Sequence, residues 1–338
     1  KSLVAWREIR NKFDVYQLVR SVQKKLKLPR EGDFNLSEFV DKAYALGPFA
    51  ALWAVEGLGH DYADAARERG DELQDLLRGE RIRDLPAKSL LMLHAGIGLS
   101  FAQRLLEPLN AKTPDEEIAQ AVGEFVRLCR ENSEPGYTGA ALESLGLVTR
   151  TFHAELVEPV DRAVAAFGPD TQGFFWHGIG RAIYFLLVNF LPYRDPIYRA
   201  VEMGREEAPH DIARQNVMAG TAWALTLVNM RHPEVMAGFL EEHGDDLWEA
   251  RAAFQNGVQS SMIMRFDTSE DDPNIETFRN FEPSESKGRL PEQWTRLIRT
   301  PIDDGLDRFY PVLKEKQRLE EVFRFQPLDA LVASLSKK

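Results

Sequence analysis

Side chains that could carry chemistry recur beside glycines in segments of this chain that look alike: Glu56, His60, His94, His177 and Arg181. His60 follows Glu56 by four residues, and this spacing puts both on one face of a helix. Arg181 follows His177 by the same number. Converging carboxylates and imidazoles can ligate a metal ion or act as an acid and a base. The metal candidates are therefore Glu56, His60, His94 and His177, and the catalytic candidates are Glu56, His94, His177 and Arg181.

Each of these side chains also has a structural interpretation. Polar groups on buried helices normally hydrogen-bond to neighbouring helix ends, without any catalytic role. Arg181 illustrates the point, because an unpaired guanidinium on an apolar helix would cost several kcal/mol. A carboxylate partner is therefore expected for it, and Glu56 and Glu143 are the candidates.

The segments that carry these residues recur at a near-constant period. Their central glycines are Gly57, Gly96, Gly139, Gly178, Gly220 and Gly257, at intervals of 39, 43, 39, 42 and 37 residues. Intervals of this size are typical of two-helix repeats. A glycine inside a helix costs about 1 kcal/mol relative to alanine. We therefore expect a common compensation, the close approach of neighbouring helices.

Helix signals are dense and strand-like alternation is nearly absent. Inner, glycine-bearing helices are expected over 48–60, 87–107, 137–153, 170–190, 210–229 and 247–265, and outer amphipathic helices over 62–77, 114–131, 159–167, 196–204 and 233–243. A capping box at 113–116 is expected to start the helix over 114–131, with Ile118, Val122, Phe125, Val126 and Cys129 on its buried face.

These helices predict an all-α protein of about six helical-hairpin repeats, either an open α-solenoid or a closed α/α toroid. The array would span residues 46–266, between an N-terminal cap over 1–45 and a C-terminal cap over 267–338. The second cap would end in a charged helix over 313–323. All three parts would form one structural domain.

The amino-acid composition restricts the classes of partner and the location expected for this protein. The net charge of −11 and the absence of a Lys/Arg cluster among aromatic residues argue against a nucleic-acid partner. The most apolar window, 174–193, contains His177, Arg181 and Asn189, so we expect a buried helix there and no membrane span. A single cysteine excludes a disulfide framework. A cytoplasmic location is slightly favoured, while an export signal before Lys1 stays open.

Aromatic side chains gather near the fourth and fifth repeats. Trp176, Tyr184 and Trp223 could line an apolar cavity that holds a long unsaturated molecule. The alternative for these three residues is ordinary core packing.

Taken in order, the repeat-centre motifs are similar to those of a bacterial family of unassigned function whose members occur beside enediyne polyketide synthases. The similarity rests on Glu56-Gly57, on 92–98, on the Gly-Ile-Gly-Arg-Ala run at 178–182 continuing to 185, and on 211–214, 219–222, 254–265 and 291–294. Family members usually have a glutamine in place of His177, and the third repeat, around Gly139 and Gly146, follows the pattern poorly. The resemblance implies an accessory role in making or handling a polyketide-derived polyene.

The sequence thus leaves two functions open. One is an accessory protein, enzyme or chaperone, that binds an apolar metabolite in a groove lined by the glycine-bearing helices. The other is a protein–protein interaction scaffold without catalytic activity. Neither the reaction nor a cofactor is indicated.

Overall fold

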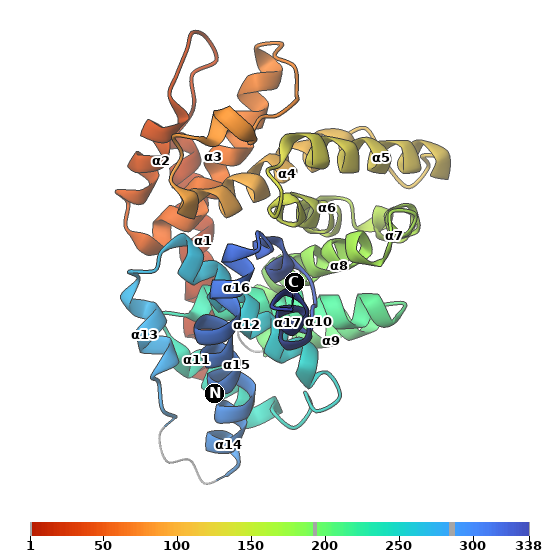
Figure 1. The fold of residues 1–338 in the computed structure, drawn as a ribbon. Coiled ribbons are helices and arrows are strands. Elements are labelled where there is room, and N and C mark those ends of the chain that lie inside the picture. The colour runs from red at the N-terminus through yellow and green to blue at the C-terminus, as the bar shows by residue number, and fades with distance from the viewer. Residues whose placement is uncertain (1, 192–194, 284–287, 338) are drawn as a thin grey trace.

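The computed structural model describes residues 2–191, 195–283 and 288–337 (Figure 1). Within these ranges the chain forms helices and connecting loops and no β-strand, apart from a single bridge between Leu77 and Ser133. The all-α class predicted from the sequence is therefore confirmed.

The glycine-bearing segments form long, mostly buried helices. They are α3 (Pro48–Glu68), α4 (Leu90–Leu106), α6 (Thr138–Phe152), α8 (Pro169–Phe185), α10 (Asp211–Asn229) and α12 (Arg251–Thr268). Each packs extensively against the next in chain order. Pro48 and Pro169 occupy the first turn of their helices, where a missing N–H does no harm.

Glycine sets the spacing between these helices. A methyl group at Gly96 of α4 would collide with the backbone oxygen of Glu56 in α3, and one at Gly178 of α8 with that of Glu143 in α6. Since a neighbouring backbone cannot move aside as a side chain can, each helix approaches its neighbour only because the Cβ is missing.

Two of the six expected glycines do not make this approach. Open space surrounds Gly57, and it is Gly59 that lies against the backbone of Leu93. Gly139 faces the ring of Phe174 instead of a backbone, while Gly146 takes the close position in α6. The sequence interval therefore located these helices but missed the contact residue in two of them.

Among the described residues, four further α-helices lie between the glycine-bearing ones along the chain. They are α5 (Asp115–Asn132), α7 (Val157–Ala165), α9 (Pro196–Glu207) and α11 (Pro233–His243). The expected stripe on α5 is buried, but its capping box does not form, because the Thr113 hydroxyl accepts from the amide of Asn110 at 3.0 Å. The outer helix expected over 62–77 was wrong. Instead, α3 continues to Glu68, where it ends. Gly70 follows shortly after with a φ of 76°, a conformation that is common just beyond a helix C-terminus.

The apolar window over 174–193 is not one helix. Helix α8 ends at Phe185, and a 3-10 turn, η4 (Leu187–Phe190), follows. The Asn189 side chain donates to the Ile183 oxygen at 2.7 Å and thereby satisfies a carbonyl at the end of α8.

A different stretch of the described residues, Ala87–Leu106, has the length and apolarity of a membrane span, yet 78% of its apolar window is buried in the protein. The core helix of a globular protein has the same properties.

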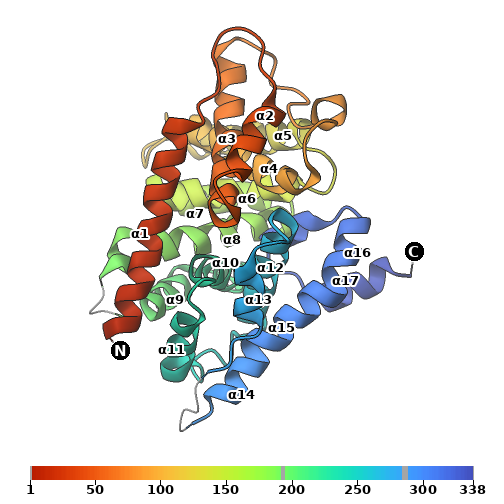
Figure 2. The same cartoon turned by 90° about the vertical axis from the view of Figure 1, so that its left-hand side faces the viewer.

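The flanking segments are also helical. The N-terminal part contains α1 (Ser2–Lys25) and α2 (Leu36–Tyr44). The C-terminal part contains α13 (Pro273–Arg279), then a continuous helical run made of α14 (Leu290–Trp294), η6 (Thr295–Arg299), α15 (Thr300–Asp304), η7 (Gly305–Phe309) and α16 (Tyr310–Glu315), and finally η8 (Leu319–Phe323) and α17 (Leu328–Leu335). Figure 2 shows α1 and the α14–α16 run along two sides of the molecule.

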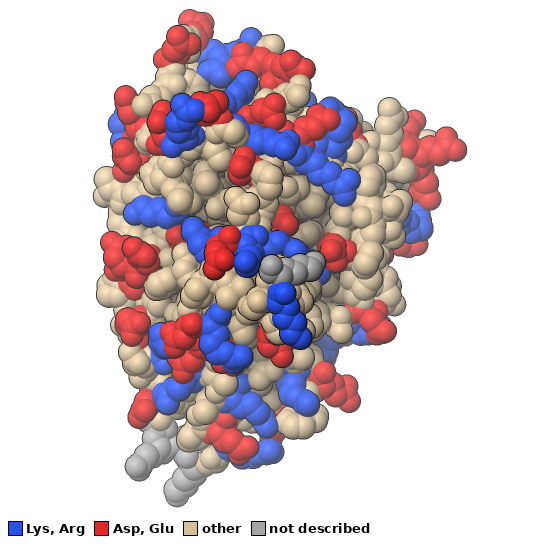
Figure 3. Space-filling model, in the orientation of Figure 1, with Lys and Arg blue, Asp and Glu red and all other residues tan. Residues whose placement is uncertain are grey.

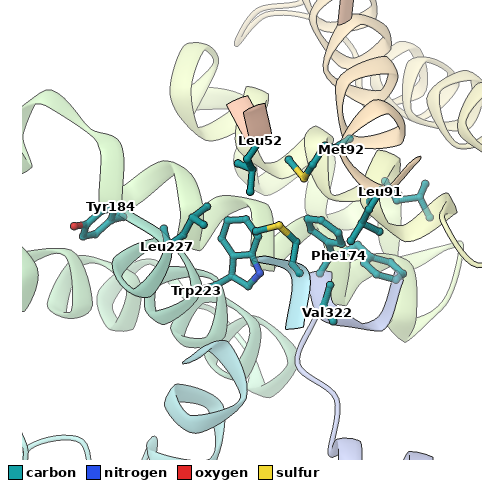
Figure 4. Packing of buried hydrophobic residues seen from close by; sticks show 14 of the residues in the cluster. Leu52, Leu91, Met92, Phe174, Tyr184, Trp223, Leu227 and Val322 are labelled. Carbon is teal, nitrogen blue, oxygen red and sulfur yellow. The ribbon is translucent and has the colours of Figure 1, made fainter. Parts of the chain in front are cut away.

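The helix expected over 313–323 was wrong as well. Helix α16 ends at Glu315, and Gln317 adopts a φ of 53°, which turns the chain before η8 begins. The short helix η8 then packs between α6, α8 and α12. Figure 4 shows Val322 of η8 pointing into the same interior as Leu52, Met92 and Trp223. The C-terminal segment thus contributes to the core, beyond covering one end of the helices.

Candidate functional site: a buried ionic cluster

Arg181 lies at the centre of a buried group of ionisable side chains from three glycine-bearing helices. Its Nη1 donates to Glu143 Oε2 of α6 at 2.8 Å, and its Nη2 donates to Glu56 Oε1 of α3 at 3.3 Å. Its guanidinium carbon also lies 4.7 Å from the centre of the Trp223 ring. The carboxylate partner expected from the sequence is confirmed, and both candidates supply it.

His177 completes the cluster. Its Nδ1 lies 3.0 Å from Glu143 Oε1, so that Glu143 joins the imidazole and the guanidinium. Its Nε2 is buried without a hydrogen-bond partner among the described residues. The rings of Trp223 and Phe323 lie edge-on, at centroid distances of 6.0 and 6.4 Å. We therefore define the buried ionic cluster as Glu56, Glu143, His177 and Arg181.

Burial affects the pKa values of Glu56, His177 and Arg181 in this cluster. Burial raises the pKa of Glu56, although Arg181 opposes the shift. Burial lowers the pKa of His177, against the influence of Glu143, so its imidazole is neutral near pH 7. Burial by itself would lower the pKa of Arg181, but the two glutamates outweigh it and raise that pKa. Arg181 consequently stays charged.

The cluster is largely withdrawn from solvent, with Glu56 its most exposed member. Four pockets formed by described residues lie elsewhere, and none of their linings contains a cluster residue. Glu143, His177 and Arg181 are nearly inaccessible. A paired cluster of this kind holds the three helices together.

Two of the predicted site residues lie apart from the cluster. His60 is half-buried and bonds to Gln103 Oε1 at 2.8 Å, near the protein surface. His94 is buried, and both ring nitrogens bind the backbone: Nδ1 the Leu90 oxygen at 2.6 Å and Nε2 the amide of Glu134 at 3.0 Å. Because an amide only donates, Nε2 accepts and Nδ1 carries the proton. Burial lowers the pKa of His94 to about 4.

The expected four-residue metal set is therefore not assembled. Among the described residues, the one group of three or more potential ligands with atoms within 4.8 Å of one another is Asp195, Glu242 and His243. None of the predicted metal residues belongs to it. His243, the last residue of α11, was not among the predicted site residues. Its Nε2 in fact lies 2.7 Å from Asp195 Oδ2, and its ring stacks on Tyr198.

The three aromatic candidates also lie in different places. Trp176 donates from Nε1 to Asp161 Oδ1 at 2.7 Å, on the side of α7. Tyr184 accepts from Asn229 Nδ2 at 2.8 Å and lies under the ammonium of Lys12 from α1. Only Trp223 touches the buried ionic cluster, and Figure 4 shows it well separated from Tyr184. None of the three residues lines any of the four pockets described in this structure.

Sequence reasoning missed a buried pair on α1. Glu8 Oε1 lies 2.5 Å from Lys12 Nζ, and both side chains are fully buried. Lys12 also donates to the Asn189 oxygen at 3.0 Å, while Asn11 Nδ2 donates to Asn229 Oδ1 at 2.8 Å. The spacing of four between Glu8 and Lys12 was the available signal, but on an exposed helix it looks like an ordinary surface pair.

An apolar groove opens between α9, α10 and α12. Its volume is about 390 Å³, and its walls include Val201 of α9, Val217 and Met218 of α10, Ala253 of α12, and Phe325. The charged residues Arg205, Asp211, Arg214 and Glu249 also line the groove. This combination of apolar walls and a few polar groups is typical of small-molecule sites.

A scan against protein-family models found no match, and searches of curated proteins and of solved structures found none either. The similarity to the enediyne-associated family accordingly rests on the sequence motifs alone.

Proposed function

We propose that this protein binds an apolar metabolite in the groove between α9, α10 and α12, as an accessory protein in the biosynthesis of a polyketide-derived polyene. The apolar groove carries the proposal. Its volume lies in the range of ligand sites, and two glycine-bearing helices form much of its wall. The biosynthetic context comes from the motif resemblance. The proposal concerns binding and includes no chemical step.

The shape of the groove suggests the kind of ligand. Val217, Met218 and Ala253 offer apolar contact, and Met adapts to irregular ligand shapes. Arg214 at the lining is exposed and pairs with Asp211 on the same helix. An elongated apolar chain with a polar or acidic end would satisfy both features.

We further propose that the glycine-bearing helices are the inner layer of a six-repeat array whose ends approach each other. Three contacts support this arrangement. Arg181 of α8 reaches Glu56 of α3, and the Trp53 ring of α3 lies 6.5 Å from that of Phe185. Between the two end helices, the guanidinium of Arg265 in α12 lies 6.0 Å from the centre of the Phe49 ring at the start of α3. The array would then be a closed toroid more than an open solenoid.

A fluorescent probe tests the groove. Titration with cis-parinaric acid, a conjugated polyene fatty acid, should show saturable binding to the intact chain. Ala252→Trp is the informative variant, because Ala252 lines the groove yet is exposed, so the larger ring fills the groove without entering the core. We expect the affinity to fall at least about tenfold, or 1.4 kcal/mol.

The matched control is Ala119→Trp, which places the same ring at an exposed position on α5, away from the groove. This variant should bind the probe like the unaltered chain. Equal affinity in both variants, or no saturable binding at all, would contradict the assignment of the groove.

A further inference from the structure

Large apolar side chains are exposed on α1 to an unusual extent. Among the described residues, eight large hydrophobic side chains are exposed, and four belong to this helix: Leu3 (83%), Trp6 (59%), Phe13 (49%) and Tyr16 (62%). A fifth, Leu187, belongs to η4. The centre of the Phe190 ring of η4 lies 5.1 Å from the centre of the Phe13 ring of α1. Isolated exposed apolar residues are normal, but a cluster of this kind marks an interaction surface.

The opposite side of α1 is firmly attached to the protein. Glu8 and Lys12 are fully buried against α8 and its following turn, and Asn11 bonds to Asn229 of α10. Figure 2 shows the helix running along the surface with its other side open. The exposed side chains are therefore displayed on a fixed support.

The charge of this region opposes that of the rest of the chain. The first 30 residues contain nine Lys or Arg and two Asp or Glu, whereas the whole chain carries −11. Exposed basic residues on α1 without a carboxylate partner among the described residues are Arg10, Arg20, Lys24 and Lys25. Asp14, the exposed acid on the helix, lies 3.5 Å from Arg231. Aromatic and basic side chains thus share one open face.

We propose that this face of α1 binds the surface of an anionic lipid bilayer. Trp and Tyr rings favour the headgroup region, where one end is apolar and the other wet. Lys and Arg are attracted to the negative surface potential. Amphipathic helices with this composition lie in the plane of the interface.

A protein partner fits this face less well. Binding hot spots in protein interfaces are large side chains that fill pockets on well-packed surfaces. The apolar residues of α1 instead spread over its broad solvent-facing side, and the four described pockets contain no α1 residue in their linings. A broad helix face of rings and cations matches a plane of headgroups. The inference is independent of the metabolite groove.

Vesicle co-sedimentation tests the proposal. The intact chain should sediment with vesicles of phosphatidylcholine and phosphatidylglycerol in equal parts, much less with phosphatidylcholine alone, and less as salt is added. The double variant Arg10→Glu/Arg20→Glu should weaken the binding at least about thirtyfold, since each basic residue near an anionic surface contributes about fivefold. The double variant Lys112→Glu/Lys337→Glu, with the same change in net charge at exposed sites outside α1, should bind like the unaltered chain.

A second pair of variants tests the apolar contribution. Trp6→Ser/Tyr16→Ser should reduce sedimentation with the anionic vesicles and leave the circular-dichroism melting curve unchanged, whereas Phe152→Ser removes an exposed ring elsewhere and should not reduce it. Absence of binding to anionic vesicles would overturn the proposal. So would equal binding to both lipid compositions, or equal effects of the α1 variants and their controls. Each of those results would leave the groove experiment unaffected.

Discussion

Arg181 and Glu143 form an ion pair at 2.8 Å with both side chains withdrawn from solvent, at 3% and 0% exposure. The two residues come from adjacent glycine-bearing helices, α8 and α6, and Glu56 adds a third helix to the pair. The pair therefore ties together segments that are far apart in the sequence.

Replacement of Arg181 should be severe. Arg181→Ala leaves two buried carboxylates without their cation, so we expect the free energy of unfolding to fall by about 3 kcal/mol or more. Urea denaturation followed by circular dichroism measures this change. Arg162→Ala is the control, because Arg162 pairs with Asp115 and Glu158 in solvent and its loss should cost less than about 1 kcal/mol. An unchanged melting temperature combined with lost ligand binding would instead place Arg181 in a functional site.

His94 should make stability depend on pH. Its folded pKa of about 4 lies below the ordinary value of 6.5, because burial disfavours the imidazolium. As the pH falls from 6.5 towards 4, the unfolded chain takes up the proton and the folded chain does not, so stability is lost over this window. The loss attributable to His94 should reach roughly 3 kcal/mol. The measurement is the difference in unfolding free energy between the intact chain and His94→Gln across these pH values. Parallel curves for the two proteins would show that His94 does not titrate in this way.

Alanine substitutions at two glycines distinguish the effect of close helix packing on stability from the effect of helix propensity. Gly178→Ala places a methyl group against the backbone of Glu143 and should destabilise the protein by about 1–3 kcal/mol, or prevent folding. Gly57→Ala meets open space and should be neutral or stabilising by up to about 1 kcal/mol, because alanine favours the helix. Thermal unfolding of the two variants compares them directly. Similar melting temperatures would argue against the close approach of α6 and α8.

The two parts of the C-terminal segment should differ in importance. Deletion of residues 328–338 removes α17, in which only Leu328 is buried, so the melting temperature should fall by a few degrees at most. Deletion of residues 319–338 also removes Val322 and Phe323 from the core, and loss of one such phenylalanine alone costs about 3–5 kcal/mol. Binding of an anilinonaphthalene dye should then rise as the region around Trp223 opens. Equal stability of both truncated chains would contradict the described packing of η8.

The sequence by itself determined the helical class, the approximate position of most helices and the need for close contacts. Helical periodicity is a local property, which is why the buried stripe on α5 was predicted correctly. Regular glycine intervals carry a free-energy cost that only close packing offsets, so they located the helices that touch. The requirement for an acid near Arg181 followed in the same way, from the cost of burying a charge.

Tertiary structure decided which groups meet. His177 and Arg181 share a cluster with Glu56, but His60 reaches the surface and His94 turns to the backbone of Leu90 and Glu134, since rotation and register between helices depend on contacts distant in sequence. Gln317, with its positive φ, directs η8 between α6, α8 and α12, and no local pattern announces that route. The separation of Trp176, Tyr184 and Trp223 has the same origin: residues on neighbouring buried helices face different partners once the helices pack, and periodicity along one helix does not specify the partner.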